Sequence, residues 1–293
     1  MKSPRKYTSA GALRKALEDR LLAIAGTEKV DISRLRRQVA FGRLLARLFR
    51  DESAPWVLKG GYALELQLNV ARATVDIDLA LPAAREFSSD TIEADQTVRD
   101  MLQAAAGVDL GDWFAYTISA PMKDLDAAPY GGARYPVEAR MDARIFARFH
   151  LDVGIGDIVI KPLGTLRVRD WLDFAGIPAP EIHLIPREQQ VAEKLHAYTL
   201  PRRTPNSRVK DLVDLILLIR SGDLQEDRLR EAARRTFERR RTHSIPADLP
   251  QPPEAWSTQF RELSKECGLH TDIEESFSEV RRFFGPIIVQ QEK

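Results

Sequence analysis

Two aspartates lie two positions apart on a short apolar segment, and this segment limits the possible folds of the chain more than any other. Residues Val75–Leu81 read VDIDLAL and alternate in the manner of a half-buried β-strand. Asp76 and Asp78 therefore point to the same face, roughly 6.6 Å apart along the strand. Like charges this close repel each other and are costly to desolvate unless a cation joins them. A divalent metal with hard oxygen ligands, Mg²⁺ or Mn²⁺, is the simplest such cation.

A strand, a glycine pair and a helix precede the two aspartates. The apolar run Trp56–Leu58 is followed by Lys59 and Gly60–Gly61, and Tyr62–Leu68 continues with helix-forming residues. Glycines before a helix present backbone N–H groups at the positive end of the helix dipole, which suits a phosphate group. Lys59 adds a positive charge beside them. A phosphate cradle combined with metal-binding carboxylates indicates a nucleotide site.

The segment LKGGYALEL, followed by RATVDIDL, resembles the AbiEii/AbiGii-type nucleotidyltransferase toxins. This family includes the MenT toxins and belongs to the polymerase-β-like nucleotidyltransferase superfamily. The resemblance implies that Gly60 and Gly61 hold the triphosphate and that Asp76 and Asp78 hold the metals. One position differs, because Tyr62 stands where the family often has Thr or Ser. A small hydroxyl that could touch a phosphate is therefore missing or replaced by a bulky one.

A third acidic residue follows on a later predicted strand. Residues 134–143 and 144–153 alternate as neighbouring strands, and Asp152 in the second is flanked by apolar residues. By its spacing alone, Asp152 fits a surface residue beside a turn equally well. The resemblance implies that a carboxylate on a neighbouring strand completes the metal site. It makes Asp152 the first candidate for this role and Asp157 the second.

The last part of the chain is predicted to be helical. Helices are predicted over residues 186–200 and 210–220, where EKLHA and RVKDLVDL resemble later motifs of the same family. The resemblance implies that Lys194 stabilises charge at the triphosphate or the leaving pyrophosphate and that Asp211 has a positioning role. By the sequence alone, Lys194 also fits a surface lysine, and Asp211 fits a simple ion pair with Arg208.

These patterns predict an α/β fold of the α+β type with two lobes. The N-terminal nucleotidyltransferase lobe, residues 1–165, would contain two leading helices, 9–25 and 32–50, and a mixed sheet. The C-terminal lobe, residues 166–293, would be a helical bundle that closes the nucleotide cleft. Residues 160–186 contain four prolines and are predicted to be an irregular linker.

Arginines gather in and near the C-terminal helices. A charged helix is predicted over residues 225–241, and two more helices over 254–267 and 271–284. The formal net charge is +1, so any contact with a nucleic acid depends on local patches. Such patches fit RNA phosphates, and they equally fit solvated helix ends whose cations complement the helix dipole. The arginines considered for RNA are Arg202, Arg203, Arg208, Arg239 and Arg240.

Other features of the sequence exclude several classes of protein. Cys267 is the single cysteine, which excludes an intramolecular disulfide framework and a cysteine-rich zinc site. The N-terminal segment has no apolar core of the signal-peptide type, and no run approaches the length of a membrane span. A cytoplasmic protein is therefore expected. The five histidines show no metal-ligand spacing.

The combined motifs predict metal-dependent transfer of NMP from an NTP to an acceptor hydroxyl, with Mg²⁺ or Mn²⁺ and release of pyrophosphate. The resemblance implies that the protein is a toxin of a toxin–antitoxin system. The resemblance implies a cognate antitoxin as partner and tRNA as acceptor, with translation and growth blocked as a result. Thr74 is assigned to the nucleotide site, and a phosphate on it is a hypothesis for switching the metal site off. The oligomeric state and the preferred base stay open.

Two other functions fit parts of the sequence. The first is a nucleotidyltransferase of the same superfamily that acts on a small molecule. The second is a non-enzymatic protein that binds a nucleic acid or a partner and keeps a decayed nucleotidyltransferase fold. Tyr62 favours the second, whereas the intact pair Asp76 and Asp78 argues against it, because a dead site has little reason to keep two adjacent charges.

Overall fold

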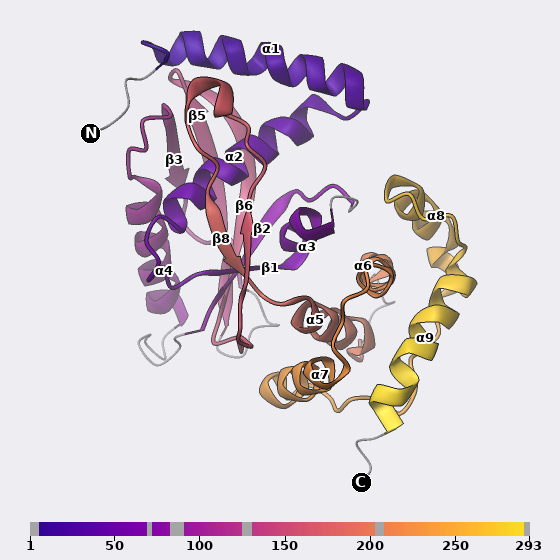
Figure 1. Ribbon diagram of the computed structural model, residues 1–293. Helices are drawn as coiled ribbons and strands as arrows, with labels where there is room; N and C mark the ends of the chain where they lie inside the picture. The colour runs from indigo at the N-terminus through magenta and orange to yellow at the C-terminus, as the bar shows by residue number, and fades with distance from the viewer. Residues whose placement is uncertain (1–5, 69–71, 83–90, 125–130, 203–207, 290–293) are drawn as a thin grey trace. The chain divides into compact units, whose positions relative to one another are not determined.

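The computed structural model describes residues 6–68, 72–82, 91–124, 131–202 and 208–289 (Figure 1). By their internal contacts, the residues divide into two units that interleave along the chain. Unit 1 consists of Met1–Leu58, Thr74–Asp157 and Thr165–Leu184, and unit 2 consists of Lys59–Ala73, Ile158–Gly164 and Ile185–Lys293. The single boundary after residue 165 is a simpler division and stays a prediction.

A mixed sheet forms the centre of unit 1. Its strands are β1 (Val57–Lys59), β2 (Asp76–Leu81), β3 (Phe114–Ile118), β4 (Lys123–Asp124), β5 (Gly132–Met141), β6 (Arg144–Ile155), β7 (Gly164–Arg167) and β8 (Glu181–Leu184). Within the described residues, the strand order is β3-β5-β6-β2-β1-β8-β7, with β4 paired to β5. The pairs β2–β6 and β1–β8 are parallel. The pairs that β5 makes with β3, β4 and β6 are antiparallel.

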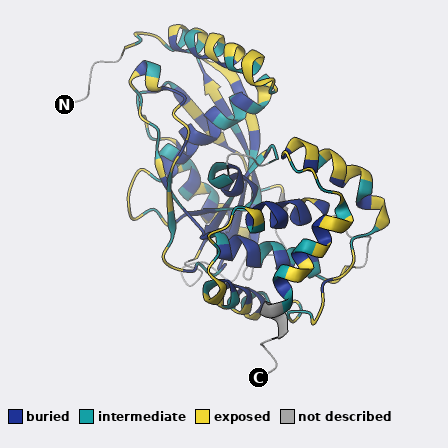
Figure 2. Ribbon diagram, turned by 45° about the vertical axis from the view of Figure 1, so that its right-hand side comes forward, coloured by how far each residue is buried: buried dark blue, intermediate teal, exposed yellow. Residues whose placement is uncertain are grey.

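Helices cover this sheet, and the first two begin at side-chain caps. The helices are α1 (Ala10–Glu28), α2 (Ile32–Leu48), α4 (Thr91–Ala106) and the short 3-10 helix η2 (Asp173–Ala175). Ser9 accepts a hydrogen bond from the backbone N–H of Ala12 at 3.2 Å, and Asp31 accepts one from Arg34 at 3.0 Å. Helix α2 packs on β6 and β8, and α4 packs on β3 and β5. The outer side of α1 is exposed (yellow in Figure 2), and its buried side carries Leu13, Leu17 and Leu21.

A buried ion-pair cluster connects α2 to the segment before β3. Arg47 Nη2 lies 2.6 Å from Asp112 Oδ1, and Arg43 Nε lies 2.7 Å from Asp112 Oδ2. Burial opposes the charge on Asp112, but the bonds from Arg47 and the charge of Arg43 outweigh it and lower the pKa of this carboxyl. The cluster therefore stays ionised at neutral pH and fixes α2 against the start of β3.

The hairpin formed by β5 and β6 contains one shift of register. Near the turn Arg140 pairs with Ile145, and the next pair is Ala139 with Ala147. Strand β6 therefore has one extra residue at this point, which is a β-bulge. Beyond the bulge, every β5 residue faces the β6 residue one position later than the one it would face in a hairpin without the bulge. This shift decides which side chains of the two strands meet at the far end of the hairpin.

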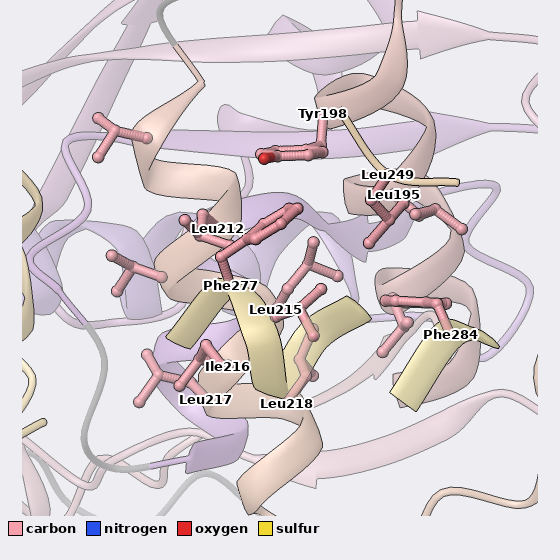
Figure 3. Close-up of a cluster of buried hydrophobic side chains, with 14 of the residues drawn as sticks. Leu195, Tyr198, Leu212, Leu215, Ile216, Leu217, Leu218, Leu249, Phe277 and Phe284 are labelled. Atoms are coloured by element: carbon pink, nitrogen blue, oxygen red, sulfur yellow. The ribbon is translucent and has the colours of Figure 1, made fainter. Parts of the chain in front are cut away.

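Unit 2 is built from helices around α6. The helices are α3 (Gly60–Leu68), α5 (Arg187–Thr199), α6 (Val209–Arg220), α7 (Glu226–Arg240), α8 (Ser257–Glu266), α9 (Ile273–Val289) and the 3-10 helix η3 (Glu254–Trp256). Helix α6 packs against α3, α5, α8 and α9, and α5 also packs against α7. Figure 3 shows the resulting apolar core, whose labelled side chains include Leu195, Tyr198, Leu212, Leu215, Ile216, Phe277 and Phe284.

Cys267 follows α8 and is buried in the same core. Burial raises the pKa of its thiol to about 11. Since the thiolate is the reactive form of cysteine, the thiol is inert near neutral pH.

In the described part of the chain, none of the helices combines the length and the apolar character needed to cross a membrane.

The predicted α/β fold class is confirmed, with a mixed sheet and a helical C-terminal part. The prediction of an irregular linker over residues 160–186 is wrong for two segments, because β7 and β8 lie there. Strand β8 pairs in parallel with β1, with Leu184 opposite Leu58. It has only four residues and lies between prolines, so its alternation is too short to stand out against the turn signals.

Candidate functional site

Three carboxylates lie together on adjacent strands. Asp76 and Asp78 are in β2, and the parallel register sets Asp78 opposite Asp152 of β6 and Asp76 opposite His150. Paired residues of neighbouring strands point to the same face of the sheet, so the three carboxylates share one face. The structure thus brings together the three residues predicted as metal ligands, whose role as ligands stays a prediction. The second candidate, Asp157, is buried beyond the end of β6.

The guanidinium group of Arg134 joins these carboxylates. Arg134 of β5 lies opposite Asp152 and donates from Nε to Asp152 Oδ1 at 2.8 Å and from Nη2 to Asp152 Oδ2 at 2.6 Å. The same Nη2 lies 3.3 Å from Asp76 Oδ2. The bonds to Asp152 raise the pKa of Arg134, so its positive charge is permanent. The sequence motifs did not predict Arg134, because its place opposite Asp152 depends on the β-bulge.

His150 contacts Asp76 from another side. Its Nδ1 lies 3.0 Å from Asp76 Oδ1, so Asp76 is held between His150 and Arg134. The absence of a metal-ligand spacing had set His150 aside in the sequence. The available signal was its position two residues before Asp152, which places both side chains on the same face of one strand.

The three carboxylates have the right chemistry for a divalent metal. Carboxylate oxygens are the ligands that Mg²⁺ and Mn²⁺ prefer. Among the residues that the structure describes, no group of three or more His, Cys, Asp or Glu side chains is arranged to hold a metal ion. Both oxygens of Asp152 and Oδ2 of Asp76 instead contact Arg134, and Oδ1 of Asp76 contacts His150. The donor types fit a metal, while the arrangement in the structure fits a guanidinium.

The predicted phosphate-binding residues lie at the start of α3, in unit 2. Lys59 ends β1, and Gly60 begins α3 with a φ of 68°, in the left-handed region that favours glycine. Lys59 Nζ lies 3.9 Å from Glu193 Oε2. Tyr62, after Gly61, is 1 % exposed, and burial raises the pKa of its hydroxyl. Tyr62 is therefore buried and offers no surface hydroxyl in place of the family's Thr or Ser.

Lys194 belongs to a buried cluster of charges within unit 2. Its Nζ lies 2.7 Å from Asp214 Oδ2 and 3.0 Å from Asp211 Oδ1. Asp214 is fully buried and also accepts hydrogen bonds from Arg72 Nε and Nη2 at 3.2 and 3.1 Å. Burial disfavours the charged form of Lys194, but Asp211 and Asp214 outweigh it and raise the pKa of this amine. Lys194 is thus held as a cation by two carboxylates of α6.

This geometry separates the interpretations of Lys194 and Asp211 that the sequence left open. Lys194 is not a surface lysine, because its side chain is 16 % exposed. Asp211 does contact Arg208, at 3.6 Å, and binds Lys194 at the same time. Asp214 and Arg72 had no predicted role. The signal for Asp214 was its spacing of three residues from Asp211, which puts both on one side of α6.

The arginines considered for RNA differ in their exposure. Arg202 is exposed, and Arg208 is partly exposed beside its ion pair. Arg240 is 10 % exposed and lies 3.6 Å from a glutamate of α5. Arg239 has intermediate exposure, and Arg203 lies outside the described residues. A role of these arginines in RNA binding stays a prediction.

Thr74 lies just before β2 and is buried. A modifying enzyme reaches a buried hydroxyl only after local opening of the chain. Its assignment to the nucleotide site and the phosphorylation hypothesis both stay predictions.

The sequence between residues 43 and 282 matches the family described as the nucleotidyl transferase AbiEii toxin of type IV toxin–antitoxin systems. The chain belongs to this AbiEii family. The match extends over both units and includes the carboxylates of β2 and β6 as well as the charged cluster around Lys194. The AbiEii chain is accordingly a nucleotidyltransferase, and a toxin of this kind implies a cognate antitoxin. A search of curated proteins finds no match.

Solved structures resemble the AbiEii chain in fold. MenT4, a nucleotidyltransferase toxin from Mycobacterium tuberculosis H37Rv, aligns with a TM-score of 0.55 and 18% identity, covering 94% of this chain and 98% of MenT4. JHP933 from Helicobacter pylori aligns with a TM-score of 0.49 and 14% identity, covering 90% and 96%. The likeness to MenT4 shows a shared fold. The predicted family and its nucleotidyltransferase class are confirmed by the family match over residues 43–282.

Proposed function

We propose that this AbiEii-family toxin transfers a nucleoside monophosphate from an NTP to a hydroxyl group of tRNA, in a reaction that needs Mg²⁺ or Mn²⁺. The observation that carries the proposal is the grouping of Asp76, Asp78 and Asp152 on one face of β2 and β6. Modification of tRNA in the cytoplasm would block translation and growth, and the cognate antitoxin would prevent it.

The three carboxylates serve as the metal ligands in this proposal. A divalent metal bound to Asp76, Asp78 and Asp152 would lower the pKa of the acceptor hydroxyl and offset the charge that develops at the α-phosphate. The strands fix the spacing of the carboxylates, because Asp78 and Asp152 are register partners. Rigid placement of the ligands is what a metal site requires of a protein.

Cations and backbone N–H groups neutralise the phosphates in this proposal. Lys59 and the backbone N–H groups of Gly60 and Gly61 bind the triphosphate. Lys194 stabilises the charge of the triphosphate or of the leaving pyrophosphate, and Asp211 positions Lys194. The contact of 3.0 Å between Lys194 and Asp211 supports this division of roles.

Cations beside α6 serve as contacts for the acceptor RNA. The exposed Arg202 and the partly exposed Arg208 are suited to phosphate groups of an RNA backbone. Their contribution would be independent of sequence, so the choice of a particular tRNA depends on other contacts.

Labelling of RNA tests the proposal directly. The purified protein is incubated with total tRNA, Mg²⁺ and each α-labelled NTP in turn, and the products are separated on a denaturing gel. We expect label on tRNA with one or two of the nucleotides, no label in Asp78→Asn, and no label after chelation of the metal. Asp142→Asn is the matched control, because Asp142 lies in the exposed β5–β6 turn and pairs with Arg144.

The other outcomes decide between the alternatives. Label that stays on a small molecule would favour the small-molecule enzyme. No label with any nucleotide would contradict the proposed reaction on tRNA. Full transfer by a folded Asp78→Asn variant would overturn the assigned mechanism.

A further inference from the structure

We infer that Arg134 is an internal counter-cation for Asp76 and Asp152, and that a divalent metal binds these carboxylates only by displacing its guanidinium group. The inference rests on the proposed function, since it takes these carboxylates as the metal ligands. It adds a positioning residue to the site and describes how the site is held together before metal and nucleotide arrive.

The contact between Arg134 and Asp152 involves both oxygens of the carboxylate. Nε and Nη2 donate to Oδ1 and Oδ2 at 2.8 and 2.6 Å, which is the two-pronged geometry that gives guanidinium–carboxylate pairs their strength. Nη2 also reaches Asp76 Oδ2 at 3.3 Å. One side chain of β5 therefore bridges carboxylates of β6 and β2, and it engages the oxygens that a metal would need.

Burial explains why these carboxylates need a cation. The side chain of Asp152 is 11 % exposed and that of Asp76 is 22 % exposed. Carboxylates this close and this buried repel each other, and Asp78 adds a third negative charge to the same face. Without a cation, the carboxylates would move apart. Arg134 offsets this repulsion and holds Asp76 and Asp152 aligned through its hydrogen bonds to both.

The guanidinium cannot leave by losing its proton. Arginine stays charged at every pH at which proteins fold, so the contact ends only when the side chain moves. The side chain of Arg134 is 30 % exposed, which gives its long stem a way toward solvent. A metal must therefore replace an existing ion pair, and its affinity is reduced by the strength of that pair.

A metal that arrives with a triphosphate meets a smaller barrier. Phosphate oxygens bind a guanidinium as well as a carboxylate does, so the nucleotide can accept Arg134 when the metal takes its place. We therefore expect metal alone to bind weakly and metal with nucleotide to bind more tightly.

The affinity for Mn²⁺ tests the inference without any measurement of activity. Free Mn²⁺ is titrated by electron paramagnetic resonance against the full-length wild type, Arg134→Gln, Arg140→Gln and Asp78→Asn. Arg140 is the matched control, because it lies on β5 and pairs with Glu138 outside the carboxylate group. We expect Arg134→Gln to bind Mn²⁺ about ten-fold more tightly than the wild type, which corresponds to about 1.4 kcal/mol. Arg140→Gln should match the wild type.

The results separate this inference from the proposed function. If the wild type binds Mn²⁺ and Asp78→Asn does not, the result supports the metal site itself. Equal or weaker binding by Arg134→Gln would then overturn the role of Arg134 alone. Absence of Mn²⁺ binding in every protein, with and without nucleotide, would overturn both.

A second variant covers the case in which Arg134→Gln does not fold. Arg134→Lys keeps the positive charge but loses the two-pronged contact, and it should bind Mn²⁺ with an affinity between those expected for the wild type and for Arg134→Gln. In the presence of a chelator, the melting temperature of Arg134→Lys should lie below that of the wild type. Added Mn²⁺ should raise the melting temperature of Arg134→Lys by more than it raises that of the wild type. An affinity of Arg134→Lys for Mn²⁺ no higher than that of the wild type would contradict the inference.

Discussion

The carboxylate of Asp214 lies 2.7 Å from Lys194 Nζ while being fully buried, and it also binds the guanidinium of Arg72. A single α6 residue thus compensates two cations from different parts of unit 2. Removal of Asp214 takes this carboxylate from Arg72 and leaves Lys194 with Asp211 alone, which is more damaging than the loss of an exposed pair.

We expect Asp214→Asn to lower the free energy of unfolding by about 3–5 kcal/mol, because Lys194 and Arg72 would keep their charges in a buried place. Urea denaturation at neutral pH measures this change. Asp227→Asn is the control, since Asp227 is exposed on α7, and its effect should stay within about 0.5 kcal/mol. Equal effects of the two substitutions would contradict a stabilising role of Asp214.

The ion pairs of Asp112 should make the stability of the protein depend on pH. Its pKa is lowered in the folded protein, so the unfolded chain binds a proton first as the pH falls. The stability that Asp112 contributes is present above its unfolded pKa of about 3.9 and is lost as the pH falls through its lower folded value. The difference in unfolding free energy between wild type and Asp112→Asn should be constant from pH 7 to 5 and shrink below about pH 4. A difference that stays constant down to pH 3 would argue against this linkage.

Two glycines should respond to alanine in opposite directions. Gly132 begins β5 with a φ of 148°, and a Cβ there would lie 2.2 Å from the carbonyl oxygen of Val153. Gly132→Ala should therefore destabilise the protein by at least about 2 kcal/mol and loosen the pairing that places Arg134. Gly26 is exposed in α1 with nothing within 4 Å of an added Cβ, so Gly26→Ala should stabilise by up to about 1 kcal/mol. Thermal unfolding compares the two, and a neutral Gly132→Ala would contradict the close approach.

A negative charge at Thr74 should weaken the proposed reaction. A phosphate there would add about −1.5 to −2 charges near Asp76, where three carboxylates already lie. We expect Thr74→Glu to lower transfer at least about ten-fold, since that requires only about 1.4 kcal/mol of repulsion. Thr74→Ser should retain activity. Circular dichroism must show both variants folded, and undiminished transfer by a folded Thr74→Glu would refute the hypothesis.

The regular parts of this fold were predictable because their sequence patterns are long. Helices such as α2 and α9 carry several turns of apolar periodicity, and the alternation around Asp76 and Asp78 is enough to put both carboxylates on one face of a strand. Strand β8 was missed because four residues between prolines carry too little pattern.

Arg134 could not be found in the same way. A hairpin without the extra residue in β6 would continue from the pair Met141–Arg144 and set Arg134 opposite Leu151, on the wrong face. The bulge moves the partner to Asp152, and nothing in the local sequence marks it. The burial of Lys194 could likewise not be predicted from the sequence, because it depends on Asp214 and on Arg72 from a distant segment.

Cys267 makes the chain convenient for site-directed spectroscopy. The native thiol is buried and largely protonated near neutral pH, so maleimide and methanethiosulfonate reagents should react with it slowly. A single cysteine introduced at an exposed position such as Met122 could then carry a spin label or a fluorophore without prior removal of the native residue. Paramagnetic broadening of that label by Mn²⁺ would report metal arrival in the natural sequence background.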